Sequence, residues 1–232
     1  MIGKQMILQL ATNKADKKTI SETHEAAGFT IVESLVAILV VTILLAAIAP
    51  VLSLSVATRV QSRRVELATQ AAKAYIDAVR TQKITAPTES GTNTPSNNPA
   101  PTTTGTLTCT ANSYCTAPTG TSLYCVDFDS TNSCEANSLT DMVVQAFRYN
   151  PNNSNSNPAI TGYTLGLRVY RSDAFRSSAT LLKNTATSKT TQRTFTPGIG
   201  QRTAPLVEMT ADISDIVPKY SDLCARFSGG CN

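Results

Sequence analysis

Residues 28–58 read GFTIVESLVAILVVTILLAAIAPVLSLSVAT. From Ser34 to Thr58 this stretch carries no charged side chain and consists mainly of Val, Leu, Ile and Ala. An α-helix needs about 20 apolar residues to cross the hydrocarbon core of a membrane, and this stretch is longer than that. We therefore predict one transmembrane helix at about residues 31–56.

The segment before this helix differs from an ordinary secretory signal peptide. In a signal peptide the small residues of the cleavage site follow a shorter apolar region, whereas here Ala26, Ala27 and Gly28 precede it. Residues 1–28 are therefore expected to form a polar leader that is removed on the N-terminal side of the helix.

The helix should continue beyond the membrane. After Thr58 the apolar residues recur at helical spacing and the charged residues lie largely elsewhere, which predicts an amphipathic helix that can pack on a sheet. Pro87 is a stop signal, so the helix covers residues 29–84. Pro50 lies inside the apolar run, and because proline lacks the N–H that an interior helix position uses, we expect a helix break there, either a kink or local melting.

The rest of the chain divides into a linker and a head. Residues 85–106 are nearly all Thr, Pro, Ser, Asn, Gly and Ala, which bury too little apolar surface to offset the entropy of ordering, so we expect a flexible linker. Residues 107–232 should form a small β-rich head. Five segments carry strand signals: Leu123–Phe128, Met142–Tyr149, Tyr163–Tyr170, Thr191–Thr196 and Leu206–Ile213.

The third of these segments has the clearest alternation. One set of side chains is apolar and predicts a buried face; the other set, which includes Arg168 and Tyr170, should point toward water. Turn-rich stretches separate the strands, which favours an antiparallel sheet. One long helix on one small antiparallel sheet gives an α+β fold.

The junction Gly28-Phe29-Thr30-Ile31-Val32-Glu33 resembles the type IV prepilin signal: Gly before the cut, Phe after it and Glu fifth in the mature chain. The resemblance implies cleavage between Gly28 and Phe29 and N-methylation of Phe29 by a prepilin peptidase and methyltransferase. It also implies a pilin-like fold.

Glu33 needs a partner if it enters the membrane. A carboxylate on an apolar helix costs about 2.5–3.5 kcal/mol at membrane depth. In pilins and pseudopilins the matching Glu meets the N-terminal amine of a neighbouring subunit, so the resemblance implies that Glu33 sets the register between subunits. The alternative is an acid in the headgroup layer, favoured by the positive end of the helix dipole.

The resemblance also implies a location and a set of partners. The chain would be a single-pass protein of the inner (plasma) membrane, with a cytoplasmic N-terminus and a periplasmic or otherwise extracytoplasmic head. It could then enter an extracellular filament. Its partners would be other pilins or pseudopilins, the prepilin peptidase, an assembly platform protein and an ATPase.

The cysteines indicate disulfides if the head lies outside the cytoplasm. All six lie beyond the apolar segment, and their spacing favours three local pairs over the other pairings: Cys109 with Cys115, Cys125 with Cys134, and Cys224 with Cys231. A zinc site is the alternative, but the chain has no C-x-x-C and its one histidine lies in the leader. We therefore expect no metal and no cofactor.

Residues 127–132, Asp-Phe-Asp-Ser-Thr-Asn, faintly resemble the start of an EF-hand loop. Asn132 replaces the loop's glycine and Ser138 its closing glutamate, so we expect an acidic surface turn and leave calcium binding open. The net charge of +4 is too weak to indicate a nucleic-acid partner.

Basic residues are concentrated between Arg148 and Val207, where Asp173 is the only acid. Such residues could contact an acidic polysaccharide or the acidic segments of a neighbouring subunit. The candidates for this contact are Arg168, Arg171, Arg176 and Arg193.

Three further stretches, residues 162–175, 192–196 and 205–210, resemble cyanobacterial hormogonium polysaccharide secretion pseudopilins. This resemblance implies a subunit of a type IV pilus-like or type II secretion-like filament that supports polysaccharide export and gliding motility. The alternatives are a minor pilin for adhesion, twitching or DNA uptake, a type II secretion pseudopilin, and a binding module tethered to the membrane. We expect no enzyme, since the mature chain has no histidine and no catalytic constellation.

Overall fold

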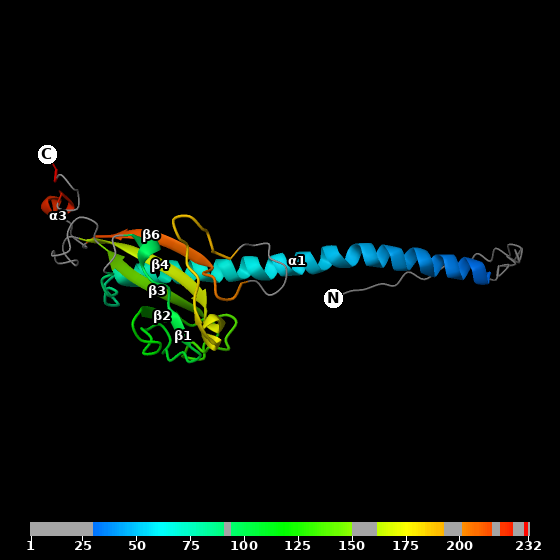
Figure 1. Ribbon diagram of the computed structural model, residues 1–232, viewed down its shortest axis with the longest axis horizontal. Helices are drawn as coiled ribbons and strands as arrows, with labels where there is room; N and C mark the ends of the chain where they lie inside the picture. Colours follow the sequence, from blue (N-terminus) through cyan, green and yellow to red (C-terminus); the bar gives the residue numbers. More distant parts are fainter. Residues whose placement is uncertain are drawn as a thin grey trace, which may run out of the picture. The chain divides into compact units, whose positions relative to one another are not determined.

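The computed structural model describes residues 30–90, 94–149, 162–192, 201–214, 219–224 and 230–231 (Figure 1). Its longest element is helix α1 (Ile31–Arg80). The strands are β1 (Thr102–Thr104), β2 (Ser122–Val126), β3 (Met142–Tyr149), β4 (Tyr163–Arg171), β5 (Ser178–Thr180) and β6 (Val207–Ile213). Three short helical turns complete the described elements: η1 (Pro95–Asn97), η2 (Ser172–Arg176) and α3 (Tyr220–Cys224).

Four strands form the main sheet in the order β2-β3-β4-β6, and all neighbours are antiparallel. These are four of the five segments predicted as strands. The fifth, Thr191–Thr196, is not a strand at Thr191 and Gln192, and its remaining residues lie outside the described part. One long helix and one small antiparallel sheet therefore agree with the α+β layout.

The outer part of α1 covers one face of this sheet. Small side chains such as Ala68, Ala71 and Ala72 are fully buried there, which lets the helix approach the strands closely, and Tyr75 is buried beside them. The strands contribute alternate residues, among them Leu165 and Leu167. The alternation of apolar residues in the strands therefore predicted this buried face of the sheet correctly.

The other face of the sheet was predicted to point toward water and is instead buried. Tyr170 and Arg168 are fully buried, and Tyr170 packs in a second apolar cluster with Leu123, Val143 and Phe175. This face is covered by chain segments that carry few apolar residues, so the alternation of β4 could not reveal their presence.

One part of this cover is residues 94–106, which we call the strap. The strap was predicted to be a flexible linker; instead it contains η1 and pairs through β1 with β5. The prediction was wrong because polar contacts order this segment: its backbone carbonyls accept hydrogen bonds from buried side chains of the sheet. Gln145 Nε2, for example, donates to the carbonyl of Pro99 over 2.8 Å.

Candidate functional site

The N-terminal turn of α1 carries Glu33. Its backbone N–H donates to Thr30 Oγ1 over 3.2 Å, so Thr30 caps the helix and Glu33 occupies the third helical position. The first turn places the carboxylate near the positive end of the helix dipole. Gly28 and Phe29, the predicted cleavage and methylation residues, lie outside the described residues.

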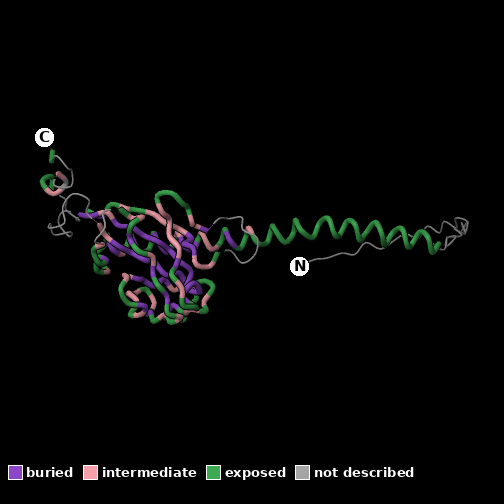
Figure 2. Tube along the Cα trace, in the orientation of Figure 1, coloured by how far each residue is buried: buried purple, intermediate pink, exposed green. Residues whose placement is uncertain are grey.

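The apolar half of α1 has no protein cover within the described chain. Every residue from Thr30 to Ala57 is exposed (Figure 2), and α1 is long and apolar enough to cross a membrane. Four hydroxyl groups along or just beyond this half donate hydrogen bonds to the helix itself, which keeps them satisfied without water. They belong to Ser34, Thr42, Ser53 and Thr58, and each donates to the carbonyl three residues earlier.

The Glu33 carboxylate is the only charged group along this half. The described residues offer it no hydrogen bond and no ion pair; the four described pairs are Arg63–Glu66, Arg148–Glu89, Arg168–Glu208 and Arg171–Asp173. An apolar helix with one unsatisfied charge in its first turn can hold a chain in a membrane. It can also bind a cationic group supplied from elsewhere.

Pro50 does not interrupt the helix. The predicted local melting was wrong, because α1 is helical at Pro50 and on both sides of it; a kink at Pro50 stays a prediction. Proline removes one backbone donor, but in an apolar segment the neighbouring N–H and C=O groups have no better partners than those within the helix. Ser53 Oγ also donates to the Pro50 carbonyl over 2.9 Å.

The basic residues proposed to contact a polyanion are not grouped on the surface. Arg168 and Arg171 are 0 % exposed and pair with Glu208 and Asp173, so their predicted role as surface contacts was wrong. Of the other two candidates, Arg176 is exposed and Arg193 lies outside the described residues.

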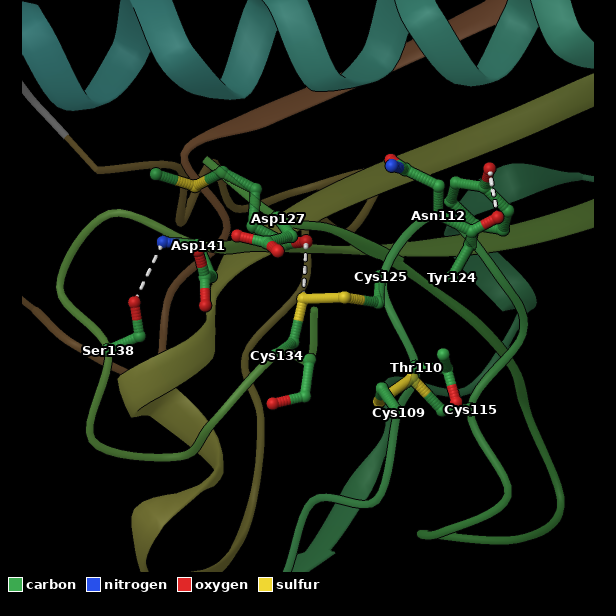
Figure 3. Close-up of a disulfide and its surroundings, with 12 residues drawn as sticks. Cys109, Thr110, Asn112, Cys115, Tyr124, Cys125, Asp127, Cys134, Ser138 and Asp141 are labelled. Atoms are coloured by element: carbon green, nitrogen blue, oxygen red, sulfur yellow. Dashed lines mark hydrogen bonds between the residues drawn. A yellow bond between two sulfur atoms is a disulfide. The ribbon is translucent and has the colours of Figure 1, made fainter. Parts of the chain in front are cut away.

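The six cysteines form three disulfides. They join Cys109 to Cys115, Cys125 to Cys134, and Cys224 to Cys231, which is the pairing that the spacing favoured. The second bond ties the end of β2 to the loop before β3 (Figure 3).

An acidic group lies beside this disulfide, and the sequence reasoning found two of its members, Asp127 and Asp129, but missed the third, Asp141. One carboxylate oxygen from each of Asp127, Asp129 and Asp141 lies within 4.8 Å of the others. The pairing of Val126 with Met142 places Asp127 and Asp141 across the start of the β2–β3 hairpin, and Figure 3 shows them side by side. Both strands were predicted, so their antiparallel pairing was the signal that could have found Asp141.

No protein-family model, curated protein or solved structure matches this chain.

Proposed function

We propose that this chain is a pseudopilin, a structural subunit of a membrane-anchored filament of the type IV pilus or type II secretion kind. The observation that carries the proposal is the unpartnered Glu33 carboxylate at the start of a helix whose next 24 residues, 34–57, are all exposed. A tethered binding module needs an apolar anchor but has no use for a charge within it. A filament subunit can use such a charge to fix its axial position relative to its neighbours.

The energetics favour a partner for Glu33. A carboxylate at membrane depth costs about 2.5–3.5 kcal/mol, whereas apolar helix surfaces slide past one another with little preference for position, because lipid tails are as apolar as the side chains. A cationic amine from a neighbouring subunit would offset that cost at one axial position only. After cleavage behind Gly28, the amine of Phe29 is such a group.

The disulfides fit a head on the outer side of the membrane. Three disulfides follow α1 in the chain, and such bonds persist in oxidising compartments. The leader and Glu33 would then face the cytoplasm, where a prepilin peptidase acts. We assign the filament to polysaccharide export with gliding motility. This assignment rests on the resemblance of residues 162–175, 192–196 and 205–210 to hormogonium polysaccharide secretion pseudopilins.

The proposal is tested by crosslinking in cells that assemble the filament. Two cysteines introduced together by Leu35→Cys and Leu44→Cys, in the exposed apolar half of α1, give each subunit two reactive sites and should produce a ladder of crosslinked oligomers in the wild-type background. Adding Glu33→Gln removes the charge but keeps the shape, and we expect it to abolish the ladder while the monomer stays in the membrane fraction.

Glu66→Gln is the matched control. Glu66 is an exposed acid on the same helix, paired with Arg63, and its replacement should leave the ladder intact. A ladder that survives Glu33→Gln would contradict subunit function and favour the tethered binding module.

A further inference from the structure

The part of α1 that follows the uncharged stretch is joined to the head by buried side-chain amides. Gln61 Nε2 donates to Gln192 Oε1 over 3.0 Å, and Gln192 Nε2 donates to the carbonyl of Ala204 over 3.0 Å. Both glutamines are buried. Gln61 lies about 4.5 Å along the helix axis beyond Thr58, where the uncharged stretch ends. The chain segment before β6 is therefore held close to the end of that stretch.

Three arginines lie at this junction, and we call Arg59, Arg176 and Arg202 the collar. Arg59 is the first charged residue after the uncharged stretch, and Arg202 precedes Ala204 by two residues. Arg202 Nη2 donates to Ser177 Oγ over 3.3 Å, which brings the end of η2, with Arg176, to the same place. Arg59 and Arg176 are exposed and Arg202 is half-buried. None of the four ion pairs among the described residues includes a collar arginine.

A buried positive charge lies behind the collar. Arg171 is 0 % exposed and donates through Nη2 to Asp173, but its Nε and Nη1 are buried and have no hydrogen-bond partner. Burial lowers the pKa of Arg171, Asp173 raises it, and the positive charges of Arg64 and Arg202 lower it again. Because arginine keeps its proton in proteins, the head holds this charge at a cost. Negative charge outside the head reduces that cost.

The described acids near the collar are already paired or lie elsewhere in the sheet. Glu66 on α1 pairs with Arg63, and Asp173 pairs with Arg171. The three acids of the β2–β3 hairpin follow β2 or precede β3, so in the strand order they lie on the other side of β4 from β6. This end of the head therefore offers an exposed positive surface beside α1.

We propose that the collar binds the anionic lipid headgroups of the membrane that α1 crosses. The headgroup layer extends about 5–8 Å beyond each side of the hydrocarbon core, so Gln61, about 4.5 Å beyond the uncharged stretch, lies within it. The planar guanidinium of arginine matches the oxygens of a phosphate with two parallel hydrogen bonds. The lipid surface would thus hold the base of the head against the membrane. This inference rests on the proposed membrane anchorage by α1 and not on filament assembly.

The test uses the full chain in lipid nanodiscs at low salt. One kind of disc contains phosphatidylcholine alone, and the other contains equal parts of phosphatidylcholine and anionic phosphatidylglycerol. Amide hydrogen exchange of residues 172–177 and 201–206 should be about fivefold or more slower in the mixed discs, because each arginine near an anionic surface strengthens the contact by about that factor. High salt should remove most of the difference.

Three variants identify the residues responsible. Arg176→Gln/Arg202→Gln should abolish the difference between the two kinds of disc, with exchange in phosphatidylcholine discs unchanged, whereas Arg176→Lys/Arg202→Lys keeps the charges and should keep most of it. Lys83→Gln/Lys189→Gln is the matched control, since it removes the same charge from exposed positions elsewhere in the head, and should keep the full difference. Glu33→Gln should also keep it, so this inference and the filament proposal can fail separately.

Equal exchange in the two kinds of disc would overturn the proposal, as would a difference that survives in Arg176→Gln/Arg202→Gln. Inorganic phosphate added to phosphatidylcholine discs should leave exchange unchanged. If it slows exchange as much as phosphatidylglycerol does, the collar is a site for a free anion and the lipid proposal is wrong.

Discussion

Replacing Arg168 by methionine should destabilise the head by about 3–5 kcal/mol, the usual cost of removing one partner of a buried ion pair. Arg168 is 0 % exposed, and its Nε donates to Glu208 Oε1 over 3.2 Å. The Glu208 side chain is only 12 % exposed, so the variant leaves a negative charge with little access to water. Methionine fills most of the space, which makes the loss mainly electrostatic.

The strap should loosen in the same variant. Arg168 Nη1 donates to the carbonyl of Asn98 over 3.0 Å and Nη2 donates to that of Pro95. Methionine can donate to neither carbonyl. Amide hydrogen exchange and limited proteolysis of residues 94–106 should therefore increase more than those of β3.

Thermal unfolding followed by near-ultraviolet circular dichroism measures the loss. All seven tyrosines lie beyond the apolar half of α1 and the chain has no tryptophan, so the signal reports the head even when the full chain is in detergent. A loss of 3–5 kcal/mol corresponds to a drop in the unfolding midpoint of about 6–20 °C, at about 2–4 °C per kcal/mol for a domain of this size. Arg176→Met, at an exposed position, is the matched control and should stay within about 0.5 kcal/mol of the wild type.

Two results would refute the reasoning. One is a midpoint for Arg168→Met equal to that of Arg176→Met, which would mean that Arg168 is hydrated in solution. The other comes from the double variant Arg168→Met/Glu208→Gln, which removes the stranded charge and should be more stable than Arg168→Met alone. If it is less stable, the ion pair is not the source of the loss.

Three further predictions concern the sheet, the pH response and the leader. Gly166→Ala should cost about 1–3 kcal/mol, since a Cβ there would lie 2.2 Å from the Phe147 ring; thermal unfolding measures this, and a neutral result would contradict the packing of that ring. Burial raises the pKa of Tyr75 above its ordinary 10.0, so the unfolded chain ionises near pH 10 while the folded chain stays protonated, and stability should fall above that pH. Tyr75→Phe should reduce the fall in midpoint between about pH 9 and pH 11, and an unchanged slope would show that other groups cause it. Mass spectrometry of the membrane-bound chain should find Phe29 as a methylated N-terminus, and Gly28→Ile should leave residues 1–28 attached; a mature N-terminus elsewhere would contradict the prepilin reading.

The sequence was informative where one physical effect dominates. The long apolar run predicted the first half of α1, and the amphipathic spacing with Pro87 predicted its end at residue 84; α1 ends at Arg80. Alternation and turn residues located β2, β3, β4 and β6 to within two residues of their observed ends. The buried face under α1 followed from the same patterns.

The sequence was uninformative where order depends on long-range polar contacts. Composition predicts disorder for the strap because it considers only apolar burial, yet Lys183 Nζ and Arg168 Nη1 both donate to the Asn98 carbonyl. These donors are 70 and 85 residues away along the chain. A local sequence pattern cannot predict hydrogen bonds between residues so far apart in the chain.

The same contacts change the meaning of the basic stretch between Arg148 and Val207. Its concentration of positive charge suggested a surface for an acidic polysaccharide, but Arg148 donates to the Pro87 carbonyl over 2.9 Å, and Arg168, Arg171 and Lys183 are likewise used within the head. Arg148, Arg168 and Lys183 of this segment therefore supply donors to backbone carbonyls of the head, and Arg171 pairs with the segment's one acid, Asp173.

It follows that charge reversal at Arg168 or Arg171 cannot test polysaccharide binding, because loss of retention would report unfolding of the head. The exposed cations Arg176 and Lys189 are the proper targets. If retention of the full chain on acidic polysaccharide at low salt is unchanged when both are reversed, with the unfolding midpoint also unchanged, these two cations are not needed for binding. The acidic polysaccharide would then contact another surface of the proposed filament rather than this part of the head.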